Sequence, residues 1–149
     1  FLISAIGGSV GYLLLAQLPD QLGQPSGWTT PTVGASGAVF GLFAATLVLN
    51  RHLGRETGGI IGVFVINGVL GFVLPNIAWQ AHLGGAVTGA AIALVLAATA
   101  PAGRTVTETA SRRRWFWPAM LGVLVVLAAA SYWRIQSVEN AILLQLYGG

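Results

Sequence analysis

Two residue types in this sequence could together perform nucleophilic catalysis. Ser36 offers a hydroxyl within the segment Gly34 to Gly37 (GASG), and His82 offers an imidazole within Ala81 to Gly85 (AHLGG). A neutral imidazole within hydrogen-bond reach activates a hydroxyl by taking its proton, and it can later return that proton to a leaving group. The two side chains could therefore attack and break an acyl bond, provided that the fold brings them together.

The other chemically capable residues are few. The chain has no cysteine, which excludes thiolate catalysis, zinc-thiolate sites and disulfides. The four acidic residues fall in predicted loops, a linker and the tail: Asp20, Glu56, Glu108 and Glu139. No carboxylate is thus available inside a span to orient His82, and a Ser-His dyad is predicted rather than a triad. No metal and no cofactor is expected.

Phe40 is the side chain best placed to orient the imidazole instead. It lies four residues after Ser36, which puts the two on the same face of a helix. Its ring could stack on His82 and fix the plane of the imidazole. A lipid-facing or core aromatic is an equally simple explanation of Phe40.

The composition indicates that these residues lie in a membrane. Of the 149 residues, 55% are hydrophobic and 7% charged, and the mean hydropathy is +0.78, far from the usual values of soluble domains. The net charge of +3 is too small to suggest a nucleic-acid partner. The expected environment is therefore the lipid bilayer.

Five stretches are apolar and long enough to cross the bilayer core, which needs about 20 residues per helix. They cover approximately residues 1–18, 33–49, 57–74, 77–100 and 115–133. The predicted fold is an all-α, polytopic transmembrane helix bundle. Residues 1–100 form a core of four spans, 101–114 a cytoplasmic linker, 115–133 an additional C-terminal span and 134–149 a tail. Because Phe1 already lies in an apolar run, further sequence is expected upstream.

Arginine placement predicts the orientation. With five spans the loops alternate sides, and six of the seven arginines fall on one side, with Arg134 alone on the other. The positive-inside rule makes the arginine-rich side cytoplasmic. The second and fourth spans then both start outside, which places Ser36 and His82 at similar depth.

Glycines on the same two spans could let them approach closely. Gly37 and Gly41 are four apart, as are Gly85 and Gly89, and such small faces allow helix backbones to meet in membranes. The alternative is that these glycines only pack helices, as expected for Gly7-x-x-x-Gly11. A serine in a membrane helix also has a purely structural explanation, because its hydroxyl can bond to the backbone of its own helix. This is expected of Ser4, Ser9 and Ser131.

Together the two motifs carry a family resemblance. GASG resembles the Gly-x-Ser-Gly signature of rhomboid proteases, and AHLGG followed by Gly89 resembles their Ala-His-x-x-Gly-x-x-x-Gly helix. The similarity covers roughly residues 1 to 100. It implies that the first four spans correspond to the third to sixth family helices, and that the fifth is the extra helix of seven-helix members.

The resemblance also implies roles for individual residues. Ser36 would be the nucleophile and His82 the general base, with the backbone amides of Ala35 and Ser36 as oxyanion donors. Phe40 matches the aromatic that stacks on the histidine. Supporting packing would come from Gly34, Gly37, Gly41, Gly85 and Gly89. The third span would be a lateral gate, residues 74–80 a cap, and the first two family helices with their His-x-x-x-Asn side chains would lie upstream.

The predicted function is that of an intramembrane serine endopeptidase, which cleaves transmembrane protein substrates in or near their membrane segments. The expected location is a bacterial plasma membrane, with the active site open to the extracytoplasmic side. One alternative is a non-catalytic rhomboid-like protein that binds transmembrane helices. A small transporter or channel is disfavoured, because neither broken helices nor paired intramembrane charges are evident.

Overall fold

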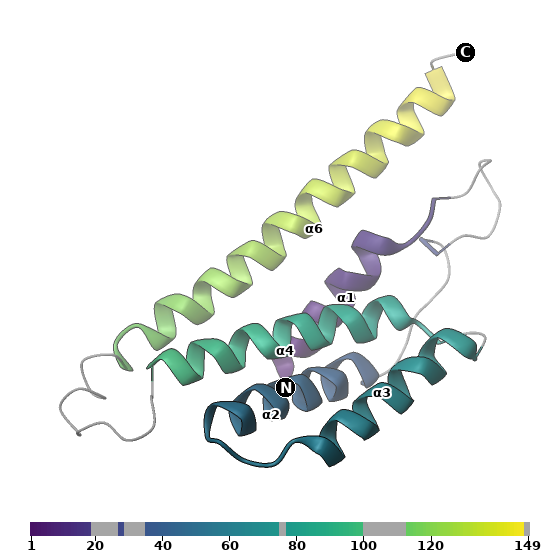
Figure 1. Ribbon diagram of the computed structural model, residues 1–149. Coiled ribbons are helices and arrows are strands. Elements are labelled where there is room, and N and C mark those ends of the chain that lie inside the picture. Colours follow the sequence, from purple (N-terminus) through teal and green to yellow (C-terminus); the bar gives the residue numbers. More distant parts are fainter. Residues whose placement is uncertain (19–26, 29–34, 75–76, 100–112, 148–149) are drawn as a thin grey trace.

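The fold is a bundle of helices (Figure 1). The computed structural model describes residues 1–18, 27–28, 35–74, 77–99 and 113–147. Its helices are α1 (Leu2–Leu15), α2 (Ser36–His52), α3 (Gly58–Val73), α4 (Trp79–Thr99) and α6 (Phe116–Tyr147). Within these ranges there is no strand, which confirms the predicted all-α class. The linker lies outside the described residues as far as position 112.

Contacts between the helices define the relative directions of α1, α2 and α4. On α1, Gly7 lies against Thr88 and Gly11 against Gly84, so α1 and α4 are antiparallel. On α2, Gly37 and Gly41 lie beside Gly85 and Gly89 in the same order, so α2 and α4 are parallel. The starts of α2 and α4 therefore share one end of the bundle, as predicted for Ser36 and His82.

Helix α4 is the centre of the bundle and contacts each of the other four helices within the described ranges. Small residues make this possible, because the buried positions of α4 are mostly Gly, Ala and Thr. In a membrane, where apolar burial gives little driving force between helices, close backbone packing supplies the stabilising contacts. Figure 1 shows α4 lying between α6 and the pair α2 and α3.

Helix α3 is held much less closely. Gly71 is its one buried residue, and most of its large apolar side chains are exposed: Ile61, Val63, Val65, Ile66, Val69, Leu70, Phe72 and Val73. Apolar surface of this extent suits a helix that faces lipid. Helix α3 thus forms an outer wall of the bundle beside α2 and α4.

Helix α6 differs from the prediction in length. It continues without a break past Trp133 to Tyr147, so the expected tail is helical as far as it is described. Residues 134–147 contain neither Gly nor Pro, so no residue there breaks the helix. Arg134 fastens α6 to α1, since its Nη2 donates a 2.9 Å hydrogen bond to the Ala16 carbonyl. Such a cation stabilises the end of a helix whose last carbonyls have no partner.

Two of the described helices are long and apolar enough to cross a bilayer, α4 with 21 residues and α6 with 32. Helices α1 and α3 are also apolar but shorter. The predicted number of five spans therefore stays a prediction.

Candidate active site

Ser36 is the first residue of α2, and Ala35 occupies the N-cap position. No side chain caps this end, so the first backbone N–H groups of α2 have no partner within the helix. The amides and the positive end of the helix dipole together favour an anion at this position. The Ser36 side chain is exposed there. Gly34 lies outside the described residues.

His82 lies in the first turn of α4 and packs against Phe40 of α2. The two rings are parallel to within 6°, and their centroids are 4.1 Å apart. This is the stack expected from the sequence. Phe40 is itself buried and lies 5.5 Å from the Phe64 ring of α3, so its orientation is well fixed.

Glycine contacts explain why the two helix starts come together. A Cβ at Gly37 would lie 2.9 Å from the Ala81 carbonyl oxygen, and one at Gly41 would lie 2.8 Å from that of Gly85. Gly89 likewise lies against Gly41. Because Gly37 follows Ser36 and Ala81 precedes His82, these contacts place the two predicted reactive residues on adjoining helix ends.

Ser36 and His82 lie on adjoining helix ends, but among the described residues no hydrogen bond joins their side chains. The His82 Nδ1 atom is buried and has no hydrogen-bond partner in this part of the chain. Catalytic hydrogen bonds are often long in a free enzyme and shorten when substrate binds, so the arrangement suits an unliganded dyad.

Comparison with known proteins matches the part of the chain that contains this candidate site. The model of the Rhomboid domain family matches residues 1–99, which include α1 to α4. The chain belongs to the rhomboid family. The resemblance seen in the GASG and AHLGG motifs is thereby confirmed, and rhomboid proteins are integral membrane proteins.

Individual rhomboid relatives match more distantly. An uncharacterized protein of Mycobacterium tuberculosis (strain H37Rv) is 30% identical over 114 residues, which are 70% of this chain and 45% of the relative. One from Mycobacterium leprae is 32% identical over 110 residues, 68% of this chain and 41% of the relative. The rhomboid protease GluP of Bacillus subtilis is 41% identical over 64 residues, 40% of this chain and 13% of the relative. No solved structure matches.

The rhomboid chain thus spans less than half the length of these mycobacterial relatives.

Other polar side chains of this rhomboid chain have local partners. Ser9 and Ser131 donate to the carbonyls of Ala5 and Leu127 on their own helices, as predicted. Ser4 behaves differently: it is buried against Gly41, because α1 also packs beside α2. The prediction that the Ser4 hydroxyl bonds to the backbone of its own helix was wrong, since no such bond is present among the described residues.

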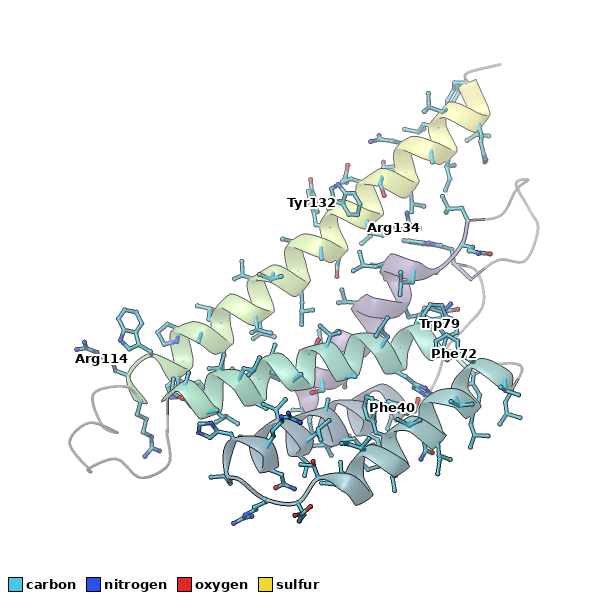
Figure 2. All side chains as sticks on the ribbon, viewed as in Figure 1. Phe40, Phe72, Trp79, Arg114, Tyr132 and Arg134 are labelled. Atoms are coloured by element: carbon cyan, nitrogen blue, oxygen red, sulfur yellow. The ribbon has the colours of Figure 1, made fainter. Side chains whose placement is uncertain are left out.

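Sequence reasoning missed the contacts that α3 makes with the site. Gly71 lies against His82, and the Phe72 ring stacks on Trp79 with centroids 4.8 Å apart, as Figure 2 shows for these two labelled side chains. Trp79 belongs to the predicted cap, of which residues 75–76 lie outside the described ranges. The available sequence signal was the presence of two aromatic residues, Phe72 and Trp79, on either side of Pro75.

Proposed function

We propose that this protein is an intramembrane serine endopeptidase with Ser36 as nucleophile and His82 as general base. The observation that carries the proposal is the placement of His82. Its imidazole stacks on Phe40, one helical turn from Ser36 on the same face of α2. Membership of the family and similarity to a protein named a rhomboid protease support the same chemistry.

The proposed reaction assigns a step to each of these groups. His82 takes the proton of the Ser36 hydroxyl while Oγ attacks the carbonyl carbon of the scissile peptide bond. Negative charge develops on the carbonyl oxygen, and the amides of Ala35 and Ser36 at the start of α2 would stabilise it. His82 then gives the proton to the leaving amine, and an acyl-enzyme remains. Water activated by His82 hydrolyses this ester and restores Ser36.

Phe40 takes over part of the task of a third catalytic residue. In a triad a carboxylate holds the histidine in its orientation, but the dyad has none to contribute. The flat contact with Phe40 fixes the plane of the imidazole instead. Gly37, Gly41, Gly85 and Gly89 support the site by keeping α2 and α4 close.

The substrates would be transmembrane proteins, cleaved in or near their membrane segments. We place the chain in a bacterial plasma membrane with five spans and the Ser36 end of the bundle outside. Arg51, Arg55, Arg113 and Arg114 lie toward the opposite helix ends, which the positive-inside rule assigns to the cytoplasm. Helix α3, the least enclosed of the wall helices, would be the side at which a substrate helix enters, with residues 74–80 above the site.

The test is cleavage of a transmembrane test substrate by the full-length protein in liposomes. Ser36→Ala and His82→Ala are each expected to lower kcat by a factor on the order of 10³ or more. Ser131→Ala is the matched control, because Ser131 lies on α6 and donates to the Leu127 carbonyl of its own helix. Undiminished cleavage by Ser36→Ala or His82→Ala would overturn the proposal.

A second candidate function is binding of membrane helices without cleavage. The His82 Nδ1 atom is buried without a hydrogen-bond partner among the described residues, whereas the histidine of a catalytic triad is oriented through such a bond; this favours the second function. If the wild-type protein retains the test substrate in a pull-down from liposomes but never cleaves it, and Ser36→Ala binds equally well, this second function is the correct one.

A further inference from the structure

Helix α3 touches the imidazole through a residue that has no side chain. Gly71 is the one buried residue of α3. A Cβ at this position would lie 3.0 Å from His82 Nδ1 and 3.4 Å from Cε1. Any side chain at position 71 would therefore press on the edge of the imidazole ring.

The ring has little freedom to yield to such pressure. One of its faces lies flat on Phe40, and Phe40 is buried against Phe64. The His82 backbone belongs to α4, which the glycine contacts lock to α2. A methyl group at position 71 therefore requires the imidazole to shift off Phe40, or α3 to move outward, by a few tenths of an ångström.

The contact between Gly71 and His82 also determines which imidazole nitrogen can accept the proton of Ser36. Nδ1 is the buried atom that faces α3, so Nε2 is the nitrogen left to accept the Ser36 proton. A neutral imidazole has one nitrogen that accepts and one that donates. The ring must keep this orientation for the proton transfer to work, and small displacements of reacting groups cost large factors in rate.

We propose that Gly71 is a positioning residue for His82. By lacking a side chain, it leaves the space in which the imidazole can lie flat on Phe40 with Nε2 toward Ser36. The proposal rests on the function proposed above, and it assigns to α3 a part in setting the geometry of the base.

The remaining glycines of α3 show that this role belongs to one position. Gly58, Gly59, Gly62 and Gly68 would each have nothing within 4 Å of an added Cβ. Gly68 lies on the same helix one turn before Gly71 and is therefore the matched control. A methyl group there meets open space, while a methyl group at position 71 meets the imidazole.

The first experiment compares Gly71→Ala with Gly68→Ala in the full-length protein in liposomes. Gly71→Ala is expected to lower kcat about 10- to 100-fold with KM changed less than about twofold, because substrate binding does not require the imidazole orientation. The rate of fluorophosphonate labelling at Ser36 should fall by a similar factor. Gly68→Ala should leave all three quantities unchanged. Equal kinetics in the two variants would overturn the proposal.

A second measurement does not depend on activity. If the methyl group of Gly71→Ala clashes with the imidazole, it should lower Tm less when the imidazole is removed, so its effect in a His82→Ala background should be smaller than in the wild type. Equal effects in both backgrounds would contradict the contact. This coupling is measurable in a protein that cleaves nothing, so failure of the proposed function and failure of the role of Gly71 give different results.

Discussion

Helices α2 and α4 meet through glycine backbones, whereas α3 meets the same two helices mainly through aromatic rings. In the first interface Gly37 and Gly41 lie directly against Gly85 and Gly89. In the second, Phe64 lies against Phe40 and Phe72 against Trp79, while most of α3 remains exposed. Helices α2 and α4, whose backbones are in contact, have no room to slide past each other. The rings between α3 and its neighbours can separate without unfolding either helix.

The difference suggests how rigidity is distributed around the site. His82 stands between the two kinds of interface, since it belongs to α4, stacks on Phe40 of α2 and touches Gly71 of α3. The locked pair would keep the serine and the histidine aligned. The loosely held wall could move for a substrate without disturbing that alignment.

The largest effect is expected from breaking the glycine interface. Gly85→Leu would drive a side chain into the Gly37 carbonyl, and neither backbone can move away. We expect loss of stability of about 3 kcal/mol or more, measured as a fall in Tm in detergent. Gly122→Leu on α6 is the control, because nothing lies within 4 Å of an added Cβ there. Similar Tm values for the two variants would show that the α2–α4 interface is not tight.

A large effect on activity is expected from Phe40, together with a weaker hold on α3, because Phe64 of α3 packs against the same ring. Phe40→Ala removes the surface on which the imidazole rests, and kcat should fall about 10- to 100-fold. Phe40→Tyr keeps the ring and should retain most of the activity. The measurement is the kcat for a transmembrane test substrate in liposomes. If Phe40→Ala cleaves as fast as Phe40→Tyr, the stack does not orient the base.

The smallest effect is expected where α3 meets α4. Phe72→Ala removes the stack on Trp79, which should cost about 1 kcal/mol. Amide hydrogen exchange should become faster along α3 while α2 and α4 stay protected. Val69→Ala, on the exposed surface of α3, should change neither. Faster exchange throughout α2 and α4 would mean that α3 is as tightly coupled to these two helices as they are to each other.

Much of the arrangement of α2, α4 and the candidate site could be predicted from the sequence. Apolar length indicated the helices, four-residue glycine spacing indicated the α2–α4 contact, and the spacing of Ser36 and Phe40 indicated the stack on His82. These features depend on local geometry that a helix imposes on its own sequence. The family resemblance rested on the same motifs.

The contacts of α3 could not be predicted in this way. Its sequence carries five glycines from Gly58 to Gly71, and a helix that is apolar on every side does not reveal which face packs inward. The full length of α6 was missed for a different reason. Arg134 and Glu139 end the apolar run, but a helix continues wherever its residues permit, inside or outside a membrane.

The most direct test of the central claim is to map the serine that reacts with a fluorophosphonate. The full-length protein is labelled in liposomes, digested and analysed by mass spectrometry, beside the His82→Ala variant. We predict one adduct on Ser36 in the wild type and its near absence in His82→Ala, because the imidazole makes this hydroxyl reactive. An adduct on another serine, or equal labelling of Ser36 without His82, would contradict the proposed dyad.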